Sequence, residues 1–324
     1  MNRDEPDEQG ERLPVDIRRQ SLFLGGPTAS GKSRVGHLLA EGLGGEIISV
    51  DSMQVYRGLD IGTAKPSPEE RAHVPHHLVD ILDLSESFDA AQFAARAQMA
   101  AADILKRGRV PIFCGGTGLY FNALLDGLGK SPDSNPVMRA ELEQCPLEEL
   151  LLELLARDPE TYERIDRKNP RRVIRAVEVL RLTGQIVTPQ RARWETEPEA
   201  SPVFFAGLER DPEDLKRRID LRVDEMFALG LEAETRRLLG LGLEANRSAM
   251  QAIGYHQVVD YLRGGLSHED TIALIKQRTR KYAKRQMTWF RRQARVQWFP
   301  VGPEESLEKI AGAVGEAFTR FRES

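Results

Sequence analysis

GPTASGKS, at residues 26–33, is the stretch that decides the fold of this chain. It lies between a short apolar strand at 21–25 and a segment with helical spacing at 34–43, the context in which G-x-x-x-x-G-K-[ST] forms a phosphate-binding loop. In such a loop, backbone N–H groups and the N-terminus of the next helix surround phosphate oxygens. We expect Lys32 to neutralise a phosphate and the Ser33 hydroxyl to ligate Mg²⁺ as the cofactor. The predicted phosphate-binding residues are Gly26, Pro27, Thr28, Ala29, Ser30, Gly31, Lys32 and Ser33.

Strands and helices alternate outward from this loop. Buried-type strands are predicted at 46–50 and 109–114, with an alanine-rich helix at 88–107 between them. An apolar run at 203–208 is predicted to return to the same sheet, and from Pro212 the chain is expected to be helical nearly to its end. The pattern predicts an α/β fold: a P-loop NTPase-like parallel sheet core covered by helices on both faces.

Four segments divide the chain. Residues 1–20 are charged and polar without the apolar core of a signal peptide, and we expect a disordered tail. Residues 21–134 and 200–324 are predicted to form the P-loop α/β core with a helical, basic C-terminal region. Residues 135–199 are helical in pattern and are predicted to be an insertion domain.

The composition is that of an ordinary globular protein. No apolar run approaches the length of a transmembrane helix, so we expect no membrane partner. The two cysteines, Cys114 and Cys145, give neither a disulfide framework nor a zinc-ribbon spacing. We expect a cytoplasmic protein that acts as a monomer, with Cys114 a small core residue in its apolar strand.

Positive charge is concentrated near the C-terminus, although the net charge of the chain is −4. Residues 271–303 contain no Asp or Glu. They contain nine basic residues: Lys276, Arg278, Arg280, Lys281, Lys284, Arg285, Arg291, Arg292 and Arg295. Such a field attracts a polyanion. The interleaved aromatic residues favour contact with RNA over a merely solvated face, although some of them must belong to the core; they are Tyr282, Trp289, Phe290 and Trp298.

The residues leave open what the phosphate loop holds. A kinase or nucleotidase normally has a second apolar strand that ends in Asp and holds Mg²⁺, whereas the strand at 109–114 is followed by Gly-Gly-Thr. This favours a diphosphate that leaves as a unit over γ-phosphoryl transfer. Asp51 follows the strand at 46–50 at the sheet edge where ligands bind, and could ligate Mg²⁺, bind a ribose or act as a general base.

Three histidines have a spacing that could bind a metal. They are His73, His76 and His77. Zinc would need a third or fourth ligand, and no cysteine is near, so a structural or hydrogen-bonding role is favoured.

Seven strings closely resemble the tRNA dimethylallyltransferase family, also called tRNA isopentenyltransferases. In chain order they lie at 26–33, 51–66, 75–78, 115–120, 169–172, 251–255 and 282–291. Ser33 stands where Thr is commoner in the family, which retains the hydroxyl. The sequence ends without the Cys/His finger of eukaryotic members, so the resemblance is to the bacterial type.

The resemblance implies a reaction. Dimethylallyl diphosphate would donate its prenyl group to N6 of adenosine 37, beside the anticodon in the tRNA anticodon stem-loop, giving N6-(dimethylallyl)adenosine and diphosphate with Mg²⁺ present. It implies that the diphosphate occupies the phosphate loop, helped by Arg218 or Arg222, and that Asp51 takes the proton from N6, with Thr117 also catalytic. Together with the basic C-terminal helix, it predicts these tRNA-binding residues: Asp51, Ser52, Met53, Gln54, Thr117, Arg139, Arg171, Arg172, Arg175, Gln251, Gly254, Tyr255, His256, Arg278, Arg280, Lys284 and Arg285.

Three other functions compete with this one. The loop motif alone predicts nucleotide binding, as in an ATP-dependent small-molecule kinase, and a free-adenylate isopentenyltransferase would share the donor. A pure RNA-binding module would not explain the phosphate loop. The basic C-terminal region favours tRNA, because an enzyme acting on a metabolite has no use for it.

Overall fold

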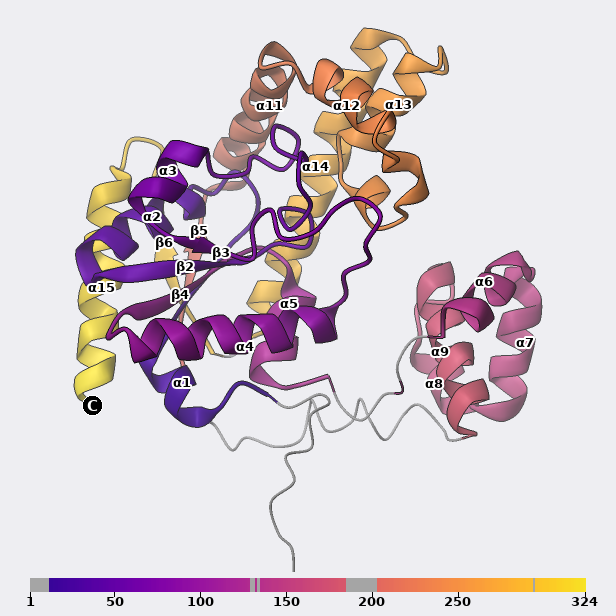
Figure 1. Ribbon diagram of the computed structural model, residues 1–324, viewed down its shortest axis with the longest axis horizontal. Coiled ribbons are helices and arrows are strands. Elements are labelled where there is room, and N and C mark those ends of the chain that lie inside the picture. Colours follow the sequence, from indigo (N-terminus) through magenta and orange to yellow (C-terminus); the bar gives the residue numbers. More distant parts are fainter. Residues whose placement is uncertain (1–11, 129–131, 133–134, 185–202, 294) are drawn as a thin grey trace, which may run out of the picture. The chain divides into compact units, whose positions relative to one another are not determined.

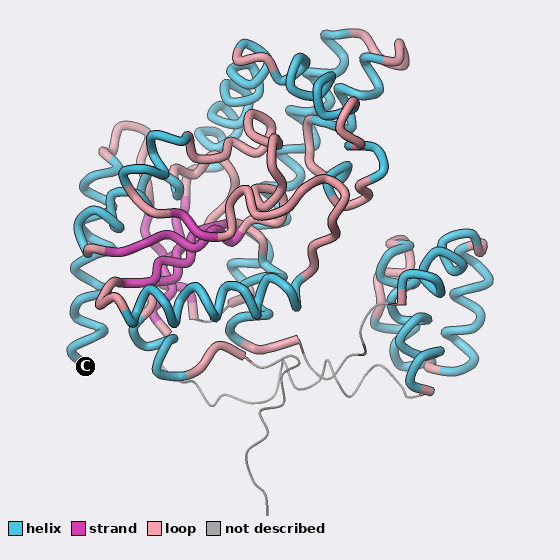
Figure 2. The backbone as a smooth tube through the Cα atoms, in the orientation of Figure 1, coloured by secondary structure: helices cyan, strands magenta, loops and turns pink. Residues whose placement is uncertain are grey.

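The computed structural model describes residues 12–128, 132, 135–184, 203–293 and 295–324. The chain divides into two compact units (Figures 1 and 2). One, here called the core unit, comprises Leu13–Leu125 and Ser201–Ser324. The other, here called the helical unit, comprises Met1–Arg12 and Asp126–Ala200.

The centre of the core unit is a sheet of six strands, ordered β3-β2-β4-β1-β5-β6. The strands are β1 (Leu22–Gly25), β2 (Gly45–Val50), β3 (His76–His77), β4 (Val110–Gly115), β5 (Phe204–Glu209) and β6 (Val296–Pro300). Every neighbouring pair is parallel, and Leu22 of β1 stands in register with Ile112 on one side and Phe204 on the other. The predicted parallel α/β sheet is confirmed.

Helices cover both faces of this sheet (Figure 1). The described helices of the core unit are α1 (Val15–Gln20), α2 (Lys32–Leu43), α3 (Pro68–His73), α4 (Ala90–Lys106), α5 (Gly118–Leu125), α11 (Pro212–Ala228), α12 (Leu231–Leu239), α13 (Tyr255–Leu262), α14 (His268–Arg291) and α15 (Leu307–Glu323). Of these, α11, α12 and α13 lie away from the faces of the sheet (Figure 1).

Alternate residues of each strand point to opposite faces, which explains why the strands read as continuous apolar runs. Leu22 and Leu24 share one apolar cluster with α2 and α15. Phe23, between them, shares the other cluster with α4, α5 and α14, and stacks on Phe113 with ring centroids 4.7 Å apart. The sheet edge is therefore held rigidly from two sides.

The helical unit has a separate apolar core. Its helices are α6 (Pro136–Gln144), α7 (Leu147–Arg157), α8 (Pro159–Arg164) and α9 (Pro170–Thr183). Buried leucines and valines from α6, α7 and α9 pack together, Leu142, Leu154 and Val177 among them. The predicted insertion domain at 135–199 falls in this unit, and its residues 185–199 lie outside the described part of the chain.

Two expectations about secondary structure are wrong. Residues 15–20, placed in a disordered tail, form α1, because Leu13 and Ile17 are buried in the core and the Leu13 amide donates to the Leu124 carbonyl at 2.7 Å. Residues 1–11 of that tail lie outside the described residues. The C-terminal region, expected to be helical nearly throughout, contains β6, which pairs with β5 at the sheet edge.

Candidate active site

The carboxyl ends of three parallel strands meet at one edge of the sheet. The phosphate loop follows β1, Asp51 follows β2, and Gly116 and Thr117 follow β4. The amides of Gly116 and Thr117 both donate to the Val50 carbonyl at 3.2 Å, which places the end of β4 directly beside Asp51. The structure therefore brings together residues that the sequence places up to ninety positions apart.

The phosphate loop turns sharply before α2. Gly31, the N-cap of α2, has φ 98°, a left-handed conformation that side chains other than glycine rarely adopt. Lys32 begins the helix, and its Nζ donates to the Pro27 carbonyl at 3.2 Å. Backbone amides and the positive end of the α2 dipole thus face the space that the loop surrounds, as an anion site requires.

Two half-buried cations stand beside this loop. Burial lowers the pKa of Lys32, the charge of Arg222 on α11 lowers it further, and Cys114 and Asp51 act in the opposite direction. Burial likewise lowers the pKa of the Arg222 guanidinium, against the attraction of Asp51. Desolvation and mutual repulsion both disfavour the charged forms of Lys32 and Arg222. An anion bound between them would stabilise those charged forms, so the pair is suited to anion binding.

Two more arginines hold the loop's backbone. Arg218 Nε of α11 donates to the Ala29 carbonyl at 2.9 Å, and the buried Arg210 donates to the Ser30 carbonyl at 2.8 Å while pairing with Asp214 at 2.8 Å. Arg218 is predicted from the sequence, whereas Arg210 is not. Its position immediately after β5, at the same sheet edge as the other strand ends, is the feature of the sequence that could have indicated it.

Gln286 of α14 connects the phosphate loop to the segment after β4. Its Oε1 accepts from the Thr28 amide at 2.9 Å and its Nε2 donates to the Gly116 carbonyl at 3.0 Å. The side chain is buried. This role of Gln286 is not predicted from the sequence either, although the residue lies within the string at 282–291.

Asp51 is oriented by its own backbone turn. Its Oδ1 accepts from the Met53 amide at 2.8 Å and from the Gln54 amide at 3.4 Å. Tyr282 of α14 faces it: burial raises the pKa of Tyr282 to about 12, the Asp51 charge contributes, and hydrogen bonds with Thr117 and Gln286 oppose the rise. Asp51 and Tyr282 therefore face one small space, and Thr117 lies beside Tyr282.

That space is a cavity of about 310 Å³, within the range typical of ligand pockets. Its lining includes Thr28 of the phosphate loop, Asp51, Arg222 and Tyr282, together with Ser52, Met53, Gln251 and Arg285. A second cavity of about 600 Å³ lies next to it, and Arg222 and Met226 line both.

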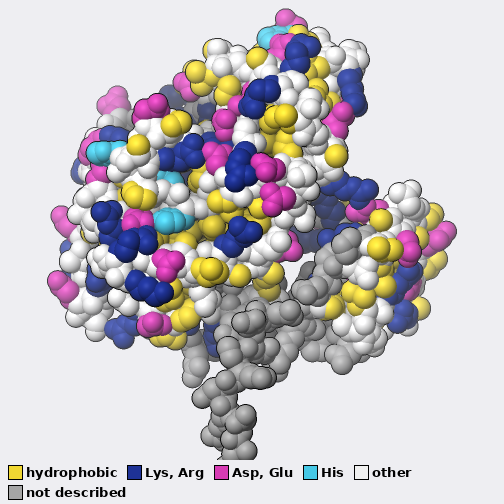
Figure 3. Space-filling model, in the orientation of Figure 1, with side chains coloured by type: hydrophobic (Ala, Val, Ile, Leu, Met, Phe, Trp, Pro, Cys, Tyr) yellow, Lys and Arg dark blue, Asp and Glu magenta, His cyan; other side chains and the backbone are white. Residues whose placement is uncertain are grey.

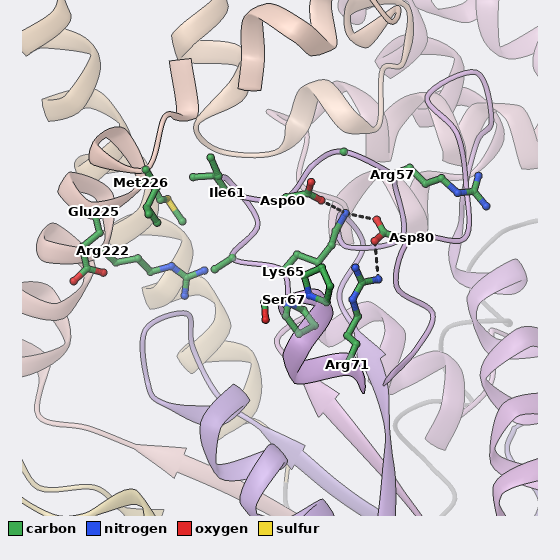
Figure 4. Close-up of a pocket in the computed structure, with 15 residues that line it drawn as sticks. Arg57, Asp60, Ile61, Lys65, Ser67, Arg71, Asp80, Arg222, Glu225 and Met226 are labelled. Carbon is green, nitrogen blue, oxygen red and sulfur yellow. Dashed lines mark hydrogen bonds and ion pairs between the residues drawn. The ribbon is translucent and has the colours of Figure 1, made fainter. Parts of the chain in front are cut away.

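Figure 4 shows this larger cavity, into which Arg222 extends from α11. On the opposite wall Lys65 bonds Asp60 at 2.7 Å and Asp80 at 2.5 Å, and Arg71 bonds Asp80 at 2.7 Å. The charges of Lys65 and Arg71 are thus neutralised within the wall, whereas Arg222 interacts with the charges of Lys32 in the phosphate loop and of Asp51.

The sequence model of the IPP transferase family matches residues 54–293. The chain belongs to this family. It is 47% identical over 277 residues to tRNA dimethylallyltransferase 1 of Citrifermentans bemidjiense, across 86% of this chain and 90% of that one. It is also 47% identical over 306 residues to tRNA dimethylallyltransferase of Geobacter metallireducens, across 93% and 99%.

Solved structures of this family have the same fold. The full-length tRNA isopentenylpyrophosphate transferase of Bacillus halodurans matches with a TM-score of 0.70 at 39% identity, over 94% of this chain and 97% of that one. A eukaryotic dimethylallyltransferase acting on tRNA matches with a TM-score of 0.76 at 27% identity, over 93% and 78%. The IPP transferase fold thus extends over nearly the whole chain.

In this IPP transferase, several predicted tRNA-binding residues line the small cavity or are exposed. Ser52, Met53, Gln251 and Arg285 line the cavity. His256, Arg278 and Lys284 are exposed. The Gln54 side chain is hydrogen-bonded within the protein: it accepts from Ser49 Oγ at 2.9 Å and donates to the Thr63 carbonyl at 3.3 Å.

Tyr255 serves the packing of the protein itself, and contact of its segment with RNA stays a prediction. The Tyr255 ring is fully buried, and its hydroxyl donates to Glu234 at 2.6 Å and accepts from the Gly62 amide at 3.1 Å. Gly254 is also buried and forms the N-cap of α13 at φ 112°. Tyr255 thus holds Gly62, in the segment that follows Asp51, and its side chain is closed to solvent.

The basic helix α14 of the IPP transferase divides into paired and exposed charges. Lys276 bonds Asp224 at 2.6 Å and Arg280 forms a two-pronged pair with Asp220, both on α11. Arg278 and Lys284 have no ion pair with any residue that the structure describes. Among the aromatic residues, Phe290 is fully buried, and Trp289 packs against it, so these two belong to the core.

In the helical unit, the predicted arginines fall into two pairs. Arg139 and Arg175 bond the buried carboxylate of Glu178 at 2.9 and 2.8 Å. Arg171 and Arg172 lie exposed in the first turn of α9. Contact of any of the four with tRNA stays a prediction.

Proposed function

We propose that this IPP transferase is a tRNA dimethylallyltransferase, which moves a dimethylallyl group from dimethylallyl diphosphate to N6 of adenosine 37 in tRNA. The observation that carries the proposal is the pair of half-buried cations, Lys32 and Arg222, both of which interact with the charge of Asp51, a residue that lines the small cavity together with Arg222. An anion site for a leaving group and a proton acceptor for a nucleophile are thus adjacent. The relatives named above, at 47% identity, support the same reaction.

The donor's diphosphate would occupy the loop at 26–33. Amides of the loop, Lys32 and Arg222 neutralise the charge that develops as the allylic C–O bond breaks, and such preorganised groups are among the largest contributions to catalysis. Arg222, rather than Arg218, is the arginine we assign to the diphosphate, because Arg218 is bonded to the Ala29 carbonyl.

Magnesium fits the chemistry of this site. The Ser33 hydroxyl is exposed in the first turn of α2, and Mg²⁺ prefers hard oxygen ligands, which a hydroxyl, diphosphate oxygens and water would provide. When bound, the ion would neutralise part of the charge on the diphosphate.

The nucleophile needs a base. The lone pair of the exocyclic N6 is delocalised into the adenine ring, so the nitrogen becomes nucleophilic only as it loses a proton. We assign that proton to Asp51, held by the Met53 amide, with Thr117 and Tyr282 beside it. Adenosine 37 must leave its stack to enter the cavity, at a cost of a few kcal/mol that is least in an unpaired loop.

The exposed face of α14 is the part of the protein that we assign to tRNA binding. The exposed charges of α14, Arg278 and Lys284 foremost, would bind phosphates of the anticodon stem-loop. A kinase is disfavoured, because β4 is followed by Gly116 and Thr117 in place of a magnesium-binding carboxylate.

We also propose that the protein acts as a monomer in the cytoplasm, where its tRNA substrate works. Light scattering during gel filtration measures the oligomeric state.

The experiment is a product analysis. The protein is incubated with dimethylallyl diphosphate, Mg²⁺ and unmodified tRNA, and the digested nucleosides are examined by mass spectrometry. We expect N6-(dimethylallyl)adenosine at position 37 and none when AMP replaces tRNA. Product from AMP would support the free-adenylate alternative, and ATP hydrolysis without prenyl transfer would support the kinase.

A further inference from the structure

Three metal-binding side chains gather on the core unit away from the phosphate loop. His37 and Glu41 lie four residues apart on one face of α2, and His73 is the last residue of α3. Glu41 Oε1 is 2.7 Å from Nε2 of His73 and 3.6 Å from Nε2 of His37. One ligand atom from each residue lies within 4.8 Å of the other two. Figure 3 shows histidines at the surface over α2 and α3.

In the structure, residues of α2 provide His73 with further metal ligands. The string at 73–77 offers three histidines, and no cysteine lies near it in the chain. In the structure His77 is bonded to Glu46 at 2.7 Å, and His76 bonds the Val74 carbonyl through Nδ1 at 2.7 Å. His73 instead faces α2, where its ring stacks on that of His37 with centroids 5.7 Å apart. The missing ligands come from another element.

The donor set is that of zinc. Two imidazoles and one carboxylate, with a water in the fourth position, are an established ligand set for Zn²⁺, whereas Mg²⁺ and Ca²⁺ prefer oxygen alone. Zinc–ligand bonds of about 2.0–2.2 Å place tetrahedral ligands roughly 3.3–3.5 Å apart. Only small movements are needed to reach that spacing. His37 is held by its burial, with 10% of its side chain exposed, whereas the His73 side chain is 66% exposed and can adjust.

We propose that His37, Glu41 and His73 form a zinc site that clamps α2 to α3. α2 begins with Lys32 and Ser33 of the phosphate loop, and α3 follows the segment that Asp51 begins. A metal ion at this point joins the two helices that flank the candidate active site. The ion would act apart from the transfer reaction, because its ligands on α2 lie more than one helical turn from Lys32.

The test is zinc binding by the full chain. Protein freed of metal by a chelator is titrated with Zn²⁺ in a calorimeter in excess Mg²⁺, which occupies oxygen sites. We expect one zinc per chain. H73A and E41Q should each weaken binding by more than about 10- to 100-fold, the loss typical when only the outer partners of a metal site are removed. Zinc should also raise the melting temperature of the wild type and not that of H73A.

A matched control exists on α13. His256 and Asp260 have the same four-residue spacing as His37 and Glu41, at 3.7 Å, and belong to no three-residue cluster of metal ligands among the described residues. H256A should bind zinc as the wild type does. Co²⁺ in place of Zn²⁺ should give the visible absorption of a tetrahedral site. Wild-type affinity in H73A and E41Q, or no stoichiometric binding at all, would overturn the proposal.

Discussion

Asp51 is held in place by the amides of Met53 and Gln54, so its position does not depend on its charge alone. Asp51→Asn keeps the shape and removes the proton acceptor. We expect kcat to fall by ~10²–10⁴, the usual loss when a general base is removed, with little change in the affinity for either substrate. Single-turnover rates across a magnesium titration measure this.

The same titration separates two roles for Asp51. Recovery of the Asp51→Asn rate at high Mg²⁺ would mean that the residue is a metal ligand, and a rate close to wild type would exclude it from the chemistry. Asp83→Asn is the control, because Asp83 is an exposed partner of Arg57.

Lys32 is expected to stabilise the complex with a bound anion and to destabilise the folded protein when no ligand is bound. Burial lowers its pKa, which means that its charge is disfavoured in the folded state. Lys32→Met should therefore raise the melting temperature without ligand, raise the KM for dimethylallyl diphosphate and lower kcat. Diphosphate should stabilise the wild type much more than the variant. Affinity for tRNA should remain.

The difference in folding stability between the wild type and Lys32→Met should change with pH in a definite direction. Below its ordinary pKa of 10.5, Lys32 binds a proton more tightly in the unfolded chain than in the folded one. The stability of the wild type therefore rises with pH toward 10.5 by this contribution, and its deficit relative to Lys32→Met should shrink. A deficit that grows with pH would contradict the assignment.

At the scale of elements, α14 combines charges that face α11 with charges that face solvent. Arg278, Lys284 and Arg285 are exposed, and their joint replacement by Ala should weaken tRNA binding. It should also flatten the dependence of log K on log salt, by roughly 0.7 for each single-strand phosphate that is no longer neutralised. Binding measured at several salt concentrations gives the slope.

The paired residues of α14 provide the comparison. Lys276→Ala with Arg280→Ala removes charges that already bond Asp224 and Asp220, so the slope should change less. An equal effect of both sets would mean that general positive charge, and not the exposed face of α14, attracts the RNA.

Elements with local signals could be predicted from the sequence, and those fixed by distant partners could not. β1, β2, β4 and β5 are apolar runs between turns, and both faces of each are buried. β3 has only two residues, and β6 is partly exposed with no regular apolar alternation. α1 was missed because its burial depends on α4 and the Leu124 carbonyl, far along the chain.

The candidate site divides in the same way. The loop residues and Asp51 could be found because their chemistry depends on neighbours in sequence. Gln286 bonds residues 258 and 170 positions away, and Arg210 bonds one 180 positions away. Tyr255 was assigned to RNA because a motif does not reveal burial; only the packing shows that its hydroxyl serves Glu234.

At the scale of the whole molecule, the two units have separate cores. Leu154 is fully buried in the core of the helical unit. Leu154→Ala should cost about 2–5 kcal/mol, which is a large share of the stability of so small a core. We expect hydrogen exchange to accelerate throughout α6–α9 while β1, β4 and β5 keep their protection. Loss of protection in the sheet as well would mean that the units unfold together.

The place of β1 in the sheet affects how the protein is made. β1 pairs with β4 on one side and with β5 on the other, and about 90 residues separate the end of β4 from the start of β5. A ribosome that adds roughly 5–20 residues per second needs about 5–20 s to synthesise them. During that time one edge of β1 presents unpaired backbone groups to other nascent chains. Chaperones that bind nascent chains, or slow translation between residues 115 and 209, should therefore influence the yield of this protein more than its final stability does.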